Sequence, residues 1–155
     1  MKFSFDRDAL LKEIAIAQEI IATKNAISIL SNVLLEAQNG SLTIKATDIK
    51  VNFETKIPVD ISEPGSTTVF CDKFMSIISS LPSGEIEFDQ NDIKINIRSI
   101  TKKAKFQLKS ITSDKFPEFT SPSNLSFFDV TVKEFKEMIG QTVFSVSDDE
   151  TRYFM

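Results

Sequence analysis

The chain has 155 residues, of which 41% are hydrophobic and 26% charged, values that are ordinary for a globular protein with one hydrophobic core. Its formal net charge of −4 argues against nonspecific attraction to nucleic acid, because binding to phosphates normally requires an excess of lysine and arginine. The charges are nevertheless segregated, because residues 85–92 contain four acids whereas residues 98–109 contain five bases and no acid.

Composition excludes several kinds of site. The chain has no histidine, which excludes a Ser-His-Asp triad, a Cys-His pair and the usual zinc sites. Its four glycines stand alone, so there is no P-loop and no dinucleotide-binding motif. A single cysteine, Cys71, excludes an internal disulfide, favours a cytoplasmic protein and is expected to be a buried, inert thiol. We predict no signal peptide, membrane span, cofactor or metal site.

The first predicted elements are a strand over residues 2–5 and a helix over residues 7–21, with the Asp6 side chain as the helix cap. Apolar residues at spacings of three and four form one stripe on this helix, which predicts that one face packs against a core. The stripe consists of Leu10, Ile14, Ala17 and Ile21.

The middle of the chain has the alternating pattern of antiparallel strands. Strands are predicted over residues 32–38, 41–47, 50–59, 67–70, 85–89, 93–98 and 103–111, with turns at Asn39-Gly40 and Glu63-Pro64-Gly65. A second helix lies between them, capped by Asp72, ending at Pro82 and carrying Phe74, Ile77, Ile78 and Leu81. Residues 114–124 have the composition of a linker. The expected fold class is α+β, with two helices packed on curved antiparallel sheets.

The opening pattern repeats with an offset of 125 residues. Phe3, Phe5, Leu10 and Ile14 correspond to Phe128, Val130, Phe135 and Ile139. Thr131 and Glu134 have capping-box spacing, so a strand followed by a helix through residues 133–146 is predicted. One strand and one helix cannot enclose a core. We therefore predict a complete first domain over residues 1–122 and the opening of a second copy over residues 123–155.

The order and spacing of motifs resemble those of the bacterial DNA polymerase III β subunits, the sliding clamps, along the whole chain. The matching segments are MKFSFDRDALLK, ISILSNVLLEA, IKATDIKV, EPGSTTVFCDKFMSIISSLP, KFPEF and TVKEFKEMIGQTVFSVSDDETRYFM.

The resemblance implies a non-catalytic processivity factor for the replicative polymerase. In this family two subunits, each with three similar domains, form a ring around double-stranded DNA and bind the polymerase and the clamp loader. Helices line the hole and sheets lie outside, so basic helices can face the DNA. Two alternatives stay open: a small interaction domain without a DNA role, and a metal-dependent nuclease that uses Asp148, Asp149 and Glu150.

The resemblance also implies site residues. The implied DNA contacts are Lys24, Arg152, Tyr153, Phe154, Arg7, Lys12 and Lys73, with Phe154 lacking a hydroxyl that the family often has. The implied subunit interface is a strand from Lys102 to Ser110, where Lys103 and Lys105 lie on one face and Phe106 and Leu108 on the other. The pattern alone also fits an edge strand that lysines protect from aggregation. Met155 matches the wall of a cleft that receives partner peptides.

Overall fold

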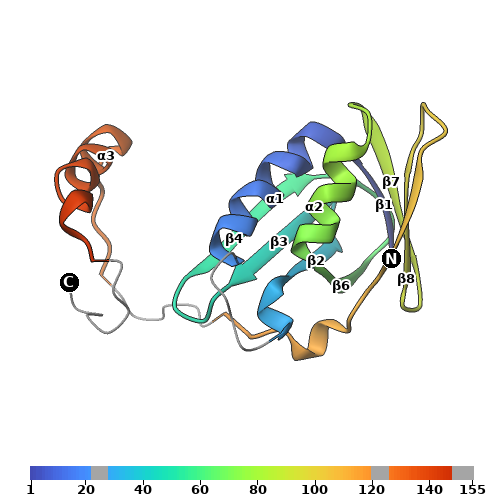
Figure 1. Ribbon diagram of the computed structural model, residues 1–155, viewed down its shortest axis with the longest axis horizontal. Helices are drawn as coiled ribbons and strands as arrows, with labels where there is room; N and C mark the ends of the chain where they lie inside the picture. The colour runs from blue at the N-terminus through green and yellow to red at the C-terminus, as the bar shows by residue number, and fades with distance from the viewer. Residues whose placement is uncertain (22–27, 120–125, 148–155) are drawn as a thin grey trace. The chain divides into compact units, whose positions relative to one another are not determined.

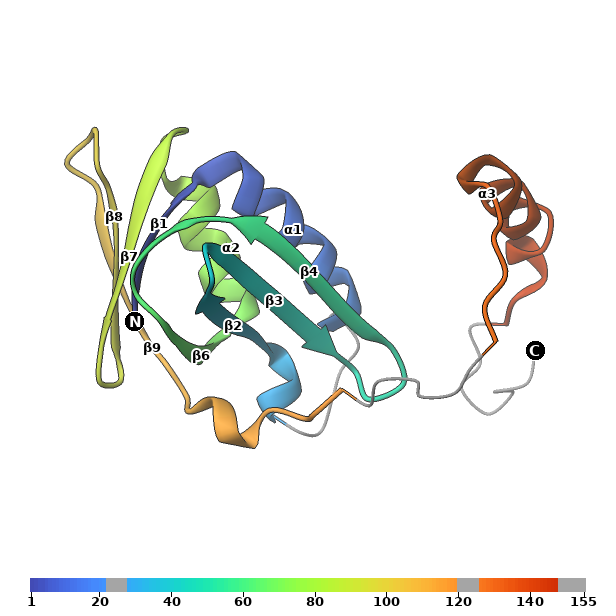
Figure 2. The same cartoon turned by 180° about the vertical axis from the view of Figure 1, so that it is seen from behind.

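The computed structural model of the chain describes residues 1–21, 28–119 and 126–147. Contacts divide the chain into two compact units, Met1–Phe119 and Thr120–Met155. The first unit consists of two antiparallel sheets and two long helices (Figures 1 and 2), which confirms the predicted α+β class.

The strands form one sheet of five and one sheet of four. The five-stranded sheet has the order β5-β1-β7-β8-β9, and the four-stranded sheet has the order β4-β3-β2-β6. The strand bounds are β1 Lys2–Asp6, β2 Asn32–Gln38, β3 Ser41–Thr47, β4 Asn52–Pro58, β5 Asp60–Glu63, β6 Gly65–Phe70, β7 Glu85–Asn91, β8 Lys94–Ser99 and β9 Lys105–Lys109. Every ladder is antiparallel, and short 3-10 helices span Ser28–Ser31 and Ser113–Lys115.

Helix α1 (Arg7–Ile21) begins and packs as its sequence predicts. The Asp6 carboxylate accepts hydrogen bonds from the backbone N–H groups of Asp8 (3.0 Å) and Ala9 (2.9 Å), which have no partner within the helix. The whole predicted apolar stripe is buried and belongs to the main core, together with Phe3 and Phe5 of β1. The side-chain spacing of α1 therefore fixes the face that covers the sheets.

Helix α2 (Cys71–Ser80) corrects one detail of the prediction. Its N-cap is Phe70, which provides no side-chain hydrogen bond, so Asp72 is not the cap. Asp72 lies instead in the first turn, where its negative charge is favoured by the helix dipole. The helix ends before Pro82, as predicted, and Phe74, Ile78 and Leu81 are buried against the core.

The turns explain two features of the strands. Asn39 and Gly40 both have positive φ values (51° and 71°), as the tight turn between β2 and β3 requires. Strand β5 was not predicted as a separate element: only Pro64 separates it from β6, and it pairs with β1 in the other sheet. At Gly65 an added Cβ would lie 3.0 Å from the Cβ of Met1, so a side chain here would require Met1 to shift.

The end of the first unit differs from a simple linker. Ile111 pairs with Thr68 of β6 through two backbone hydrogen bonds of 3.1 Å, and the Thr68 hydroxyl donates a third, of 2.9 Å, to the Ile111 carbonyl. Phe116 is buried, and the ring of Phe119 lies 5.8 Å from Lys45 Nζ. Residues 111–119 therefore pack against the four-stranded sheet and are hydrogen-bonded to it.

In the second unit the structure describes residues 126–147, and among these the predicted strand is not formed. Phe128 is 88% exposed and Val130 is 43% exposed. Helix α3 (Val132–Gly140) does form, followed by a 3-10 turn at Val143–Ser145, so it is shorter than predicted. The predicted capping box is confirmed, with Thr131 and Glu134 each bonded to the backbone of the other.

Candidate nucleic-acid and partner surfaces

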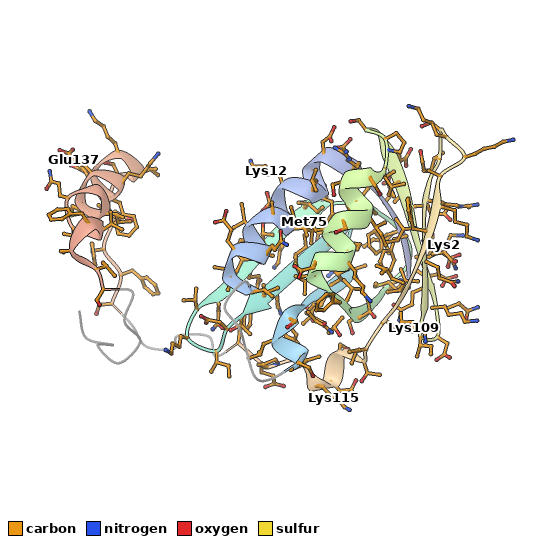
Figure 3. All side chains as sticks on the ribbon, in the orientation of Figure 1. Lys2, Lys12, Met75, Lys109, Lys115 and Glu137 are labelled. Atoms are coloured by element: carbon orange, nitrogen blue, oxygen red, sulfur yellow. The ribbon has the colours of Figure 1, made fainter. Side chains whose placement is uncertain are left out.

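The solvent side of α1 and α2 holds the predicted helix contacts to DNA. Lys12 and Lys73 are exposed, and Lys12 lies on the solvent side of α1 (Figure 3). The two helices are not a basic surface, however, because α1 carries two basic and three acidic residues and α2 carries one of each. The expectation of basic helices is therefore wrong for this unit, which offers isolated lysines among acids.

Arg7 differs from these two lysines because its hydrogen-bond donors are used inside the unit. Its Nε donates to the carbonyl oxygens of Ile78 (3.1 Å) and Leu81 (3.1 Å), and its Nη2 donates to the carbonyl oxygen of Ser79 (2.9 Å). Its Nη1 pairs with the Asp8 carboxylate, and the Arg7 side chain is only 18% exposed. Each of the three guanidinium nitrogens thus makes a contact inside the unit, to the end of α2 or to Asp8.

The edge strand β9 positions most of the predicted interface residues. It is the last strand of the five-stranded sheet, and Phe106 and Leu108 lie opposite the core residues Ile97 and Ile95 of β8. Phe106 is nevertheless 36% exposed, because no strand lies beyond β9 among the described residues. A shallow groove of ≈ 380 Å³ runs between α2 and β9, and its lining residues are Asp72, Lys73, Ser76, Ile77, Gln107 and Leu108.

Lys103 does not lie on this strand, which corrects the predicted alternation. Strand β9 begins at Lys105, and Lys103 belongs to the preceding loop. The loop is closed by a hydrogen bond from the Ser99 N–H to the Ala104 carbonyl (3.0 Å), and the Ser99 side chain accepts another from the Lys102 N–H (3.2 Å). Lys102 and Ala104, which the pattern had assigned to the strand, thus lie in the loop and bond to Ser99.

The outer face of the five-stranded sheet carries the acidic and basic stretches of the sequence side by side. Lys2 and Lys109 point from this sheet away from the helices (Figure 3). Arg98 of β8 lies opposite Glu87 of β7 and bonds to its carboxylate through Nε (2.9 Å) and Nη2 (2.8 Å). This hydrogen bond lowers the pKa of Glu87, so the carboxylate stays charged and neutralises part of the basic stretch.

Cys71 begins α2 and is fully buried, as predicted. Burial, and secondarily the charge of Asp72, raise the pKa of the Cys71 thiol to about 12. The thiolate is therefore scarce at neutral pH, which confirms that this cysteine is an inert core residue.

One cluster was not predicted from the sequence. Lys45 of β3 forms ion pairs with Glu36 of β2 (2.9 Å) and Glu54 of β4 (3.8 Å), and it also lies over the Phe119 ring. We call these four residues the Lys45 cluster. Its only signal in the sequence is the opposite charge of residues that a specific strand register brings together.

Several predicted site residues lie outside the described residues, namely Lys24, Arg152, Tyr153, Phe154 and Met155, and so do Asp148, Asp149 and Glu150 of the nuclease alternative. Within the described ranges, no group of three or more acidic, cysteine or histidine side chains is arranged to hold a metal ion. None of the helices described there is long and apolar enough to cross a membrane.

Comparisons with known proteins agree on one family. A family model described as the DNA polymerase III beta subunit, N-terminal domain, matches residues 1–120. The beta sliding clamp of Treponema pallidum is 45% identical over 155 residues, and that of Caulobacter vibrioides is 30% identical over 158 residues. Each match covers 100% of this chain and 42% of the relative, so the chain spans well under half the length of these relatives.

Solved structures give the same result. The structure described as Caulobacter crescentus pol III beta matches with a TM-score of 0.91 and 30% identity, over 99% of this chain and 41% of that chain. The DNA polymerase sliding clamp from Bacillus subtilis matches with a TM-score of 0.90 and 28% identity, over 98% of this chain and 42% of that chain. The chain therefore belongs to the family of DNA polymerase III beta subunits, and its residues 1–120 match the N-terminal domain of that family.

Proposed function

We propose that this chain is the N-terminal portion of a sliding clamp, the processivity factor of a replicative DNA polymerase. The clamp encircles double-stranded DNA without reading its sequence, tethers the polymerase and has no active site of its own. The observation that carries this proposal is the 45% identity to a beta sliding clamp along all 155 residues. The chain's own fold, with two long helices on one side of antiparallel sheets, supports it.

In this proposal the solvent side of α1 and α2 faces the DNA. Lys12 and Lys73 are the described lysines of these helices and both are exposed, and Lys24, Arg152, Tyr153 and Phe154 supply further contacts by resemblance to the family. Because acids outnumber bases on the two helices, contacts with phosphates are few and weak. Such a surface suits a ring that is held by its topology and moves along the duplex.

The edge of β9 forms the subunit interface of a homodimer. Phe106 and Leu108 supply apolar contacts there, and Lys105, with Lys103 in the adjacent loop, supplies charges for acids of the partner subunit. The exposure of Phe106 at a sheet edge that no described strand pairs with supports this assignment, because an open edge offers backbone groups and apolar area to another strand. The opposite charges would steer the pairing and are screened by salt.

Residues 123–155 form the opening of a second clamp domain after a first domain of residues 1–122. The repeated pattern and the 42% coverage of the longer relatives support this division. Met155 would then lie on the cleft that receives peptides from the polymerase and the clamp loader. A ring that acts on bacterial chromosomal DNA works in the cytoplasm.

The decisive experiment separates topological from ordinary binding. Full-length protein, loaded onto nicked circular DNA by its clamp loader, should stay bound at about 150 mM salt and leave when one cut linearises the circle. Linear DNA with both ends blocked by bulky proteins should retain it. Equal retention on open linear DNA would contradict the ring, and cleavage of DNA with Mg²⁺ would favour the nuclease alternative.

A further inference from the structure

The two helices that face DNA in the proposed function run antiparallel and are joined by polar contacts at both ends. At one end Arg7, the first residue of α1, bonds to carbonyl groups in the last turn of α2. At the other end the Gln18 side-chain amide donates to the Asp72 carboxylate in the first turn of α2 (2.8 Å). Between these ends the helices pack through buried apolar side chains.

The Arg7 contacts fit the chemistry of a helix C-terminus. The last carbonyl groups of a helix have no partner within it, and they carry the negative end of the helix dipole. The planar guanidinium offers several donors in a fixed fork, and here three carbonyl oxygens, of Ile78, Ser79 and Leu81, accept from it at 2.9–3.1 Å. A lysine ammonium at the same place could not reach all three with this geometry.

The surroundings of Arg7 complete the joint. The Asp8 carboxylate accepts a hydrogen bond from Nη1 of Arg7 on the solvent side. It accepts another (3.5 Å) from the hydroxyl of Ser83, a residue that follows α2. The Arg7 backbone N–H donates to the Gly84 carbonyl (3.0 Å). The start of α1 is therefore bonded to the end of α2 and to the segment that leads into β7, by both backbone and side chain.

We infer that Arg7 is a positioning residue, which fixes the end of α2 against the start of α1, and not a residue that contacts phosphate. This inference rests on the proposed function, because the helix layer it positions is the one assigned to DNA. It distinguishes Arg7 from Lys12, an exposed residue of the same helix.

The test compares Arg7→Met with Lys12→Met, in the full-length protein, by two measurements. Hydrogen exchange at the amides of residues 79–81, taken relative to core amides of β3, should become faster by about tenfold or more in Arg7→Met and stay unchanged in Lys12→Met. The second measurement is the slope of the logarithm of DNA affinity against the logarithm of salt concentration. Its magnitude should decrease by about 0.9 for each phosphate contact that Lys12→Met removes, and it should not change in Arg7→Met.

Arg7→Lys provides a milder variant, in case Arg7→Met lowers the yield of folded protein. Arg7→Lys keeps the positive charge, so a phosphate contact would survive, whereas the forked hydrogen bonds to α2 would be lost. We therefore expect hydrogen exchange at the amides of residues 79–81 to be faster than in the wild type. A lower salt slope in Arg7→Met with unchanged exchange in α2 would overturn the inference, as would unchanged exchange in both Arg7 variants. If Lys12→Met leaves the slope unchanged while Arg7→Met accelerates exchange, the inference stands and the DNA-facing assignment of the helices fails.

Discussion

Residues 2–21 and residues 127–140 carry the same apolar pattern but reach different structures. In the first segment Phe3 and Phe5 are buried in β1, which lies between β5 and β7. In the second, Phe128 and Val130 are exposed and form no strand, whereas the helix that follows does form. A strand takes its hydrogen bonds from neighbours distant in sequence, while a capped helix satisfies most of its own. The pattern is therefore sufficient for the helix and insufficient for the strand.

The largest effect is expected at the edge of β9, where Phe106, like Phe128, is an exposed apolar side chain that no described strand covers. If Phe106 and Leu108 meet a partner subunit, the double variant Phe106→Ala/Leu108→Ala should lose about 2–4 kcal/mol of association free energy per side chain. The full-length dimer should then dissociate at concentrations several tenfold steps higher, as measured by analytical ultracentrifugation.

The matched control for this edge is Ile49→Ala/Val51→Ala, which shortens two exposed apolar side chains in the turn between β3 and β4. We expect it to leave the dimer unchanged. If the β9 double variant remains dimeric at nanomolar concentration, β9 is a lysine-protected edge and the interface lies elsewhere.

The next effect compares equivalent positions of the two segments. Leu10→Ala removes a fully buried side chain and should lower the free energy of unfolding of the first unit by about 2–5 kcal/mol. The corresponding Phe135→Ala changes a residue that is 53% exposed, and it should lower the free energy of unfolding of the first unit by less than about 0.5 kcal/mol. Urea denaturation followed by circular dichroism measures both, and similar losses would show that the second segment is packed against the first unit's core.

A smaller effect is expected at the two helix caps. Asp6→Ala removes two hydrogen bonds to the start of α1 and should cost about 1 kcal/mol of global stability. Thr131→Ala removes half of the capping box of α3 and should reduce helix content at residues 132–140 without changing the unfolding of the first unit. Backbone chemical shifts distinguish the two outcomes, and a global loss in Thr131→Ala would contradict the separation.

The smallest effect is a pH dependence confined to α3. Hydrogen bonds from the Thr131 side chain and backbone lower the pKa of Glu134 below its ordinary value of 4.5. A carboxyl group whose pKa is lower in the folded helix than in the unfolded chain stabilises the helix at pH values above the unfolded-state pKa. This contribution is lost as the pH falls through the folded-state pKa. The helix content of residues 132–140 should therefore decrease on acidification below about pH 4.5. Glu134→Gln should show no such transition, and an equal transition in this variant would assign it to another group.

The sequence predicted the elements whose causes are local. The stripe of α1, the Asp6 cap and the Asn39-Gly40 turn depend on residues within a few positions of each other, and all three are confirmed. Strand β5 was missed because only Ile61 of its four residues is apolar, and its partner β1 lies far away in the sequence.

The candidate site was less predictable, because it depends on how charges are used in three dimensions. Arg7 and Lys12 look alike in the sequence, yet Nε and Nη2 of Arg7 bond to carbonyl groups at the end of α2, whereas Lys12 is exposed. Lys103 was placed on β9 because alternation continues through the loop that the Ser99 hydrogen bonds close. The Lys45 cluster depends on the register that sets Lys45 opposite Glu54, which no local pattern specifies.

The most direct test of this comparison is amide hydrogen exchange at Phe128 and Val130, measured in this 155-residue chain and in the full-length protein. If these residues are the first strand of a second domain, the full-length protein should supply their sheet neighbours, and exchange should slow by about a hundredfold or more. The amides of Phe3 and Phe5 should be equally protected in both proteins. Exchange at Phe128 and Val130 that stays fast in the full-length protein would contradict the claim that residues 123–155 open a second copy of the first domain.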